Sequence, residues 1–139
     1  MSFSVVDTRL GKKLEQIKEN YPFYFYRPFI TSTNIILESN TLSSVISSGI
    51  LCDISSGNVS VTFPPATVLQ SLLNMEPVNY LNFIIVAYST SFPNSNTVSI
   101  IGNTGVEIVG VSAPSISAQE TYIATLICIS VTPLKFYIM

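Results

Sequence analysis

From Ile30 to the C-terminus, short apolar runs alternate with clusters of Ser, Asn, Gly and Pro. The runs are rich in Ile, Val, Thr and aromatic residues, which favour strands, and the clusters are typical of turns. The predicted strands are residues 34–37, 49–54, 58–63, 80–88, 97–101, 106–111, 121–131 and 134–138. Short strands at this spacing predict an all-β fold, a β-sandwich or jelly-roll-like domain, over residues 30–139.

The sequence predicts a helix and a hairpin within this β-domain. Residues 66–73 follow two prolines and carry apolar residues on one helical face, which predicts one short internal helix. Residues 97–111 are predicted to form a β-hairpin, in which Gly102 and Gly105 supply the turn. The residues of this hairpin that are expected to face the core are Val98, Ile100, Val106 and Ile108.

The chain carries very few charges. Between Arg27 and Lys135 it has no lysine, arginine or histidine. The acidic residues of the same stretch are Glu38, Asp53, Glu76, Glu107 and Glu120. Charged residues make up 10% of the whole chain, against about 25% in typical soluble domains. Such a surface suits contact with other copies better than exposure on a monomer, so we predict a homo-oligomeric structural protein.

Other partners are disfavoured by the composition. Nucleic-acid binding requires a basic face, whereas the net charge of this chain is −2. The most apolar windows, residues 80–88 and 122–131, are shorter than the ~20 residues of a membrane-spanning helix, so no membrane partner is expected. No secretion signal is recognisable before the charges that begin at Asp7, which favours synthesis in the cytoplasm. Cys52 and Cys128 are therefore expected to be buried free thiols.

The sequence also argues against an enzyme. Without histidine, neither a Ser-His-Asp nor a Cys-His arrangement is possible, and two cysteines cannot complete a four-ligand zinc site. Residues 102–105 lie between two predicted strands and lack a following lysine, so they form a turn and not a phosphate loop. Glu76, Glu107 and Glu120 are the remaining candidates for a carboxylate pair. We predict no catalytic residues, no metal ligands and no cofactor.

Residues 1–29 differ in composition from the rest and are predicted to be a separate assembly or attachment segment. One face of a predicted helix in this segment consists of Val6, Leu10, Leu14 and Ile17. A helix this short is marginal alone, so its apolar face is expected to pack on its own β-domain or in a helical bundle between chains.

An aromatic run follows at residues 21–29, flanked by prolines that exclude a helix. This run is expected to lie in a groove or across a subunit boundary, or to form a first strand packed within the chain. The residues of the run that are predicted at an oligomer interface are Tyr21, Phe23, Phe25 and Tyr26.

Residues 58–139 resemble a β-domain found in surface and fibre-type proteins of giant viruses, virophages and some phages. The resemblance rests on the strand, proline and Ala-led helix at residues 59–72, the strand at 82–86, the Thr-Val-Ser-Ile and Gly-Val-Glu-Ile segments at 96–110, and the ending from Ile116 to Tyr137. It implies a homotrimeric, non-enzymatic virion component, such as a fibre head or decoration protein. A capsid or fibre protein, or a surface glycan, would be its further partner.

An alternative function is carbohydrate or receptor binding by the loops at residues 89–96 and 102–105. Asn94, Asn96 and Asn103 are the candidate ligand-binding residues of these loops, because they present amide groups at predicted turns.

Overall fold

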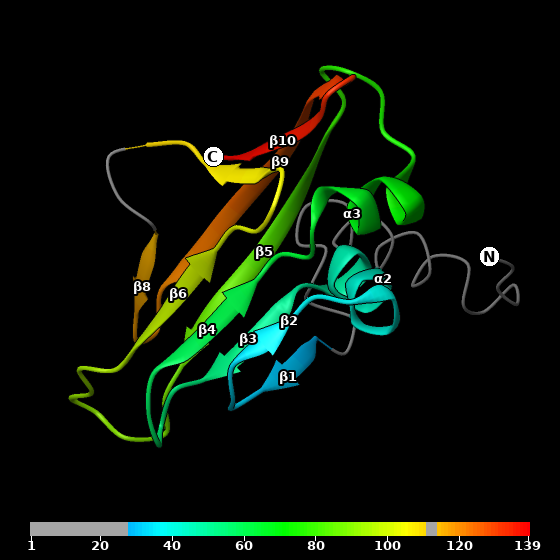
Figure 1. Cartoon of the computed structure of the whole chain (residues 1–139). Coiled ribbons are helices and arrows are strands. Elements are labelled where there is room, and N and C mark those ends of the chain that lie inside the picture. The colour runs from blue at the N-terminus through cyan, green and yellow to red at the C-terminus, as the bar shows by residue number, and fades with distance from the viewer. Residues whose placement is uncertain (1–27, 111–113) are drawn as a thin grey trace, which may run out of the picture.

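The computed structural model of this chain describes residues 28–110 and 114–139 (Figure 1). The described residues are mostly β, which confirms the predicted β-rich fold. The predicted N-terminal helix lies outside the described residues. So do the predicted interface residues Val6, Leu10, Leu14, Ile17, Tyr21, Phe23, Phe25 and Tyr26.

The strands of the described residues form two sheets. The larger sheet has six strands in the order β1-β3-β5-β9-β10-β7, and the smaller has four in the order β2-β4-β6-β8. The strands of the larger sheet are β1 (Phe29–Thr31), β3 (Ile50–Asp53), β5 (Tyr80–Tyr88), β7 (Val106–Ile108), β9 (Thr121–Val131) and β10 (Leu134–Ile138). Those of the smaller sheet are β2 (Ile35–Ile36), β4 (Val59–Thr62), β6 (Thr97–Ile101) and β8 (Ser115–Ser117). Two helices, α2 (Ser39–Ser48) and α3 (Ala66–Leu73), connect the sheets.

The first six strands wind in parallel between the two sheets. Each strand of the larger sheet, β1, β3 and β5, is followed by a strand of the smaller sheet, β2, β4 and β6. After each strand of the smaller sheet the chain returns to the larger sheet in the same direction, so the four pairings among these six strands are parallel. Strands β7 and β10 form a fifth parallel pair, and the other three pairings are antiparallel. Between two parallel neighbours among the first six strands, the chain forms one strand of the other sheet and one helix. These two elements together make up the crossover connection that a parallel pair requires. Jelly rolls consist of antiparallel strands, so this winding is not the one that the jelly-roll expectation implies.

Residues 97–111 do not form the predicted hairpin. Strand β6 belongs to the smaller sheet, whereas β7 belongs to the larger sheet and pairs in parallel with β10. The chain crosses between the sheets at residues 102–105, where Asn103 and Val106 make an isolated bridge. The facing of the side chains was predicted correctly, since Val98, Ile100 and Val106 are buried and Ile108 packs against the core. Alternation specifies which side chains face inward, but it does not specify the partner strand.

The inward-facing side chains of both sheets share one hydrophobic core. The rings of Phe63 and Phe83 meet edge to face within it, with centroids 5.2 Å apart. Cys52 and Cys128 are free and fully buried in the same core, as expected. Burial raises the pKa of Cys52 to about 12 and also raises that of Cys128, so both stay protonated and pack as small hydrophobic residues.

Helix α3 occupies the predicted residues. It begins after Pro65, buries Leu69, and ends at Asn74, which adopts a left-handed conformation with φ of 48°. Helix α2 was not predicted. It buries Leu42 and Val45 against the core and packs against β5.

Candidate assembly surface

The side of the larger sheet that points away from the core is unusually apolar. Side chains alternate along a strand, so the residues between buried positions point outward. In β5, for example, buried Phe83 and Ile85 alternate with Asn82, Ile84 and Val86. We call the outward side the outer face. It comprises Ile30, Leu51, Asp53, Tyr80, Asn82, Ile84, Val86, Tyr88, Glu107, Thr121, Ile123, Thr125, Ile127, Ile129, Val131, Lys135 and Tyr137.

Strand register joins these residues into apolar rows across the sheet. One row contains Ile30, Leu51 and Val86, and the next pairs Ile84 with Ile123. A third row places Ile127 between Tyr80 and Tyr137. The exposed fractions of Ile30, Tyr80 and Ile123 are 63%, 62% and 57%, so these side chains are largely in water. Extended apolar patches of this kind mark interaction sites.

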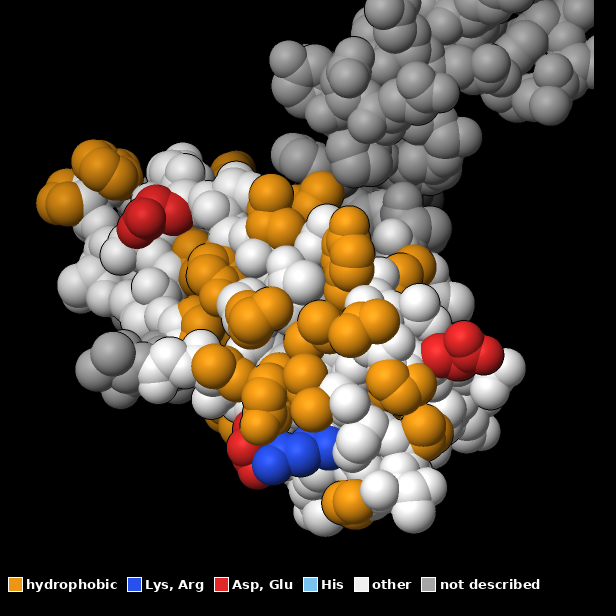
Figure 2. Space-filling model, turned by 90° about the horizontal axis from the view of Figure 1, so that it is seen from above, with side chains coloured by type: hydrophobic (Ala, Val, Ile, Leu, Met, Phe, Trp, Pro, Cys, Tyr) orange, Lys and Arg blue, Asp and Glu red, His pale blue; other side chains and the backbone are white. Residues whose placement is uncertain are grey.

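The charges of the outer face lie at its rim. Lys135 on β10 and Glu107 on the edge strand β7 form an ion pair, with Nζ 3.4 Å from Oε1. Glu107 raises the pKa of Lys135, and Tyr137, whose ring centroid lies 5.3 Å from Nζ, adds to the effect. Figure 2 shows hydrophobic side chains gathered on the face seen from above, with a basic side chain beside an acidic one. An apolar centre with a charged rim is the usual anatomy of a protein interface.

At another point of the rim, Asp53 ends β3. Its Oδ1 accepts hydrogen bonds from the Ser55 hydroxyl at 2.6 Å and from the Ser55 backbone N–H at 3.0 Å, and these lower the pKa of Asp53. The Ser55 hydroxyl oxygen in turn accepts from the backbone N–H of Thr90 at 2.9 Å. The charge of Asp53 therefore helps to hold the turn after β3 to the loop after β5.

One polar pair interrupts the apolar rows. Asn82 and Thr125 are neighbours across β5 and β9, and the Thr125 hydroxyl donates to Asn82 Oδ1 at 2.8 Å. The amide N–H groups of Asn82 have no hydrogen-bond partner in the described part of the chain. Asn82 is exposed, so these donors point into solvent from the middle of the outer face.

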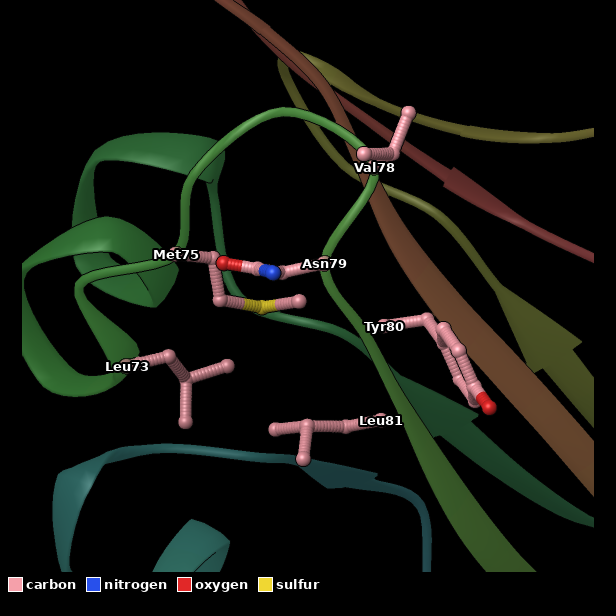
Figure 3. Close-up of a pocket in the computed structure, with 6 residues that line it drawn as sticks. All are labelled: Leu73, Met75, Val78, Asn79, Tyr80 and Leu81. Carbon is pink, nitrogen blue, oxygen red and sulfur yellow. The ribbon is translucent and has the colours of Figure 1, made fainter.

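A depression of about 370 Å³ lies between the end of α3 and the start of β5. Figure 3 shows Leu73, Met75 and Leu81 pointing toward one another there, while Val78 and Tyr80 point away. Val78 has a φ of 66° and is 76% exposed, although β-branched residues strongly disfavour positive φ. The lining therefore combines apolar side chains with the polar groups of Asn79 and Tyr80.

The loop before β5 is held in place by backbone hydrogen bonds. The Val78 N–H donates to the Cys128 carbonyl at 2.8 Å, which extends the pairing of β5 with β9. The Gln70 side chain donates to the Met75 carbonyl at 2.9 Å and accepts from the Met75 N–H at 3.2 Å. These bonds fix the position of Val78 at the end of the larger sheet.

The candidate carboxylates lie on three separate elements. Glu76 is in the loop after α3, Glu107 pairs with Lys135, and Glu120 lies in the turn before β9, where its side chain accepts from the Ser117 N–H at 3.2 Å. Within residues 28–110 and 114–139, no three or more His, Cys, Asp or Glu side chains gather at a site that could hold a metal ion. None of the helices described here is long and apolar enough to cross a membrane.

The predicted ligand-loop residues are bonded to their own chain. The side-chain amide of Asn94 donates to the Ile54 carbonyl at 3.1 Å and to Ser89 Oγ at 2.8 Å, and that of Asn96 donates to the same carbonyl at 2.9 Å. The structure thus brings Asn94 and Asn96 together. Asn103 lies apart from them, at the crossing between the sheets, and donates to the Phe63 carbonyl at 3.1 Å.

The sequence analysis did not identify the outer face, although the pattern of apolar residues along the strands indicates it. In β4 and β6, apolar residues alternate with Ser or Thr, which is typical of a strand with one face in water. In β5 and β9, apolar residues occur on both sides of the strand in nearly continuous runs. Such runs are typical of strands that are covered on both faces.

Comparison with models of protein families, with curated proteins and with solved structures gave no match for this chain.

Proposed function

We propose that this protein is a non-enzymatic structural component that assembles with copies of itself through the outer face. The two sheets around a shared core fit the β-sandwich class. The assembly that we propose is a homotrimer. The resemblance of residues 58–139 to viral surface and fibre-type domains supports a place in a virus particle, as a fibre head or decoration protein.

The observation that carries the proposal is the apolar character of β5 and β9 on both sides. Their inward residues already fill the core, and their outward residues Ile84, Ile123 and Ile127 lie outside that core in the part of the chain that the structure describes. Burying an exposed aliphatic side chain of this size contributes about 1.5–3 kcal/mol. A partner that covers the outer face would bury several such side chains, and each would stabilise the assembly by about this amount.

The test is the mass of the full chain in solution, measured by sedimentation equilibrium at low micromolar concentration. We expect about three times the 15.2 kDa of one chain. Ile123→Lys places an unpaired charge in the outer face and should weaken association at least about 30-fold. Ser99→Lys, the matched variant on the smaller sheet, should leave the mass unchanged. A 15.2 kDa species for the unmodified chain would refute the proposal.

The proposal that the protein is not an enzyme has its own test. Screens of glycosides, esters and phosphodiesters should give no turnover above background. Reproducible turnover that disappears on Glu→Gln substitution of Glu76, Glu107 or Glu120 would refute a purely structural role.

A further inference from the structure

Asn82 occupies the middle of the outer face. Its strand, β5, and the neighbouring β9 are the two central strands of the six. On one side of the Asn82–Thr125 pair lies the row of Ile84 and Ile123, and on the other lies the row of Tyr80 and Ile127. Along the ladder of β5 and β9, this is the one outward pair in which both residues are polar.

The hydrogen bonding of this pair limits what can cover it. Because the Thr125 hydroxyl donates to Asn82 Oδ1, the oxygen of Asn82 is fixed and its two amide N–H groups face outward. A purely apolar partner would remove these donors from water without replacing their hydrogen bonds, which is costly. The partner must therefore be apolar around its edge and carry acceptors at its centre.

A second copy of this chain has that arrangement. Its own outer face is apolar, with the acceptor oxygens of Asn82 and Thr125 at the centre. The face is also large enough. The six strands of the sheet contain 35 residues, which at a rise of about 3.3 Å per residue and a strand spacing of about 4.8 Å cover roughly 550 Å² per copy. Two or three copies would together bury roughly 1,100–1,700 Å², above the roughly 1,000 Å² that a specific protein interface needs.

Symmetry brings the central pairs together. In a closed assembly built on the outer faces, the midline is the part of each face that lies nearest the symmetry axis. Six strands span about 24 Å, and three faces of that width that close into a triangle place each midline roughly 7 Å from that axis. The Asn82 amides of the copies then converge on the axis, where they pair directly or through a shared water.

We propose that Asn82, oriented by Thr125, fixes the register and the number of copies of the assembly through amide hydrogen bonds at the symmetry axis. This inference rests on the proposed self-assembly through the outer face. A single buried Asn has the same effect in coiled coils, where it selects one oligomeric state at a cost in stability.

The first experiment compares the chain with Asn82→Val by sedimentation velocity and native mass spectrometry. We expect a single oligomeric species for the unmodified chain. Asn82→Val should associate at least as tightly but populate more than one species. Ser99→Val, the matched control on the smaller sheet, should retain the single species. If Asn82→Val retains it too, the inference fails while the proposed function stands, whereas a monomeric unmodified chain refutes both.

Asn82→Asp covers the case in which the valine variant does not fold. It places like charges at the axis and should weaken association at least about 100-fold at pH 7. Lowering the pH below the pKa of an ordinary aspartate, about 3.9, should restore association. Ser99→Asp should have no effect on the mass at either pH. An unchanged mass of Asn82→Asp at pH 7 would overturn the inference.

Discussion

The two sheets of this protein share one core but differ in what they expose. The smaller sheet exposes mainly hydroxyl groups, and register places Ser60, Ser99 and Ser115 side by side in one row. Ile36 and Ile101 are its exposed apolar exceptions, in the row at one end. The larger sheet exposes Ile, Val, Leu and Tyr in most of the corresponding positions. The inward side chains of both sheets are mainly apolar and share one core, so the core does not explain the difference.

This contrast separates two requirements on the same chain. A sheet that needs only one covered face can alternate apolar residues with Ser and Thr, as β4 and β6 do. Apolar side chains on the outer face of a sheet do not stabilise the fold while they are exposed to water. The larger sheet is therefore the candidate assembly surface, and substitutions on the smaller sheet are the matched controls for substitutions on the larger one.

The largest expected effect tests whether both sheets depend on one core. Gly105, at the crossing between them, has a φ of 74°, and a Cβ there would lie 2.7 Å from the Cβ of Ala66. Gly105→Val should lower the free energy of unfolding by about 2–5 kcal/mol, from backbone strain together with overpacking. Urea denaturation at fixed protein concentration measures this.

Gly57→Val is the control for that variant, because a Cβ at Gly57 would meet nothing within 4 Å. It should change the free energy of unfolding by less than about 1 kcal/mol. Both sheets of Gly105→Val should unfold in one transition. A separate early loss of one sheet would mean that the two are not sides of one cooperative unit.

A second variant turns the smaller sheet into a copy of the larger. Replacing Ser60, Ser99 and Ser115 together by Ile creates an apolar row on a face that is otherwise rich in hydroxyl groups. The free energy of unfolding should change by no more than about 1 kcal/mol, since Ile suits a strand. Light scattering should detect association beyond the unmodified oligomer and lower solubility. An unchanged mass and solubility would show that exposed apolar rows do not drive association in this protein.

Much of the fold could be predicted from local pattern. The bounds of β5, β6, β9, β10 and α3 agree with the predicted runs, because each has a clear period of two or of 3.6 between turn or proline signals. Strand partners could not be predicted in this way. The Gly-Asn-Thr-Gly segment between β6 and β7 reads as a hairpin turn, yet β7 pairs with β10, about 30 positions further along the chain.

Helix α2 shows where local pattern is too weak. Serine occupies much of its sequence and favours turns and caps over helix interiors, so residues 39–48 lack the composition of a helix. Its stability comes from tertiary contacts of Leu42 and Val45 and from its ends. The Glu38 N–H donates to Thr41 Oγ1 at 2.9 Å at the start, and Gly49, with a φ of 79°, ends it.

The candidate surface was predictable only in part. The scarcity of charge predicts association, but it does not say which face takes part. That information lies in the two-sided apolar pattern of β5 and β9, and its meaning depends on knowing which residues face the core. The central position of Asn82 required the register of β5 against β9 as well.

A smaller effect is expected at the end of the larger sheet. Val78 holds a positive φ that asparagine adopts far more readily, so Val78→Asn should raise the free energy of unfolding by about 1 kcal/mol. Val131→Asn is the matched control, because Val131 is an exposed valine within β9. It should lower the free energy by up to about 1 kcal/mol. Equal losses in both variants would mean that Val78 is not strained.

The smallest expected effect concerns pH and the charged rim. The chain has no histidine, and both thiols have raised pKa values, so the free energy of unfolding should change little between pH 5 and 7. Asp53 has a lowered pKa because Ser55 donates two hydrogen bonds to its carboxylate. Its stabilising contribution is therefore complete above the unfolded value of about 3.9 and is lost as the pH falls through the lower folded value. Asp53→Asn and Ser55→Ala should each reduce the acid-induced loss of stability, which thermal unfolding from pH 6 down to pH 2 measures. If neither variant alters that loss, the rim carboxylate contributes nothing to the stability of the larger sheet, and the contrast between the sheets lies in the apolar rows alone.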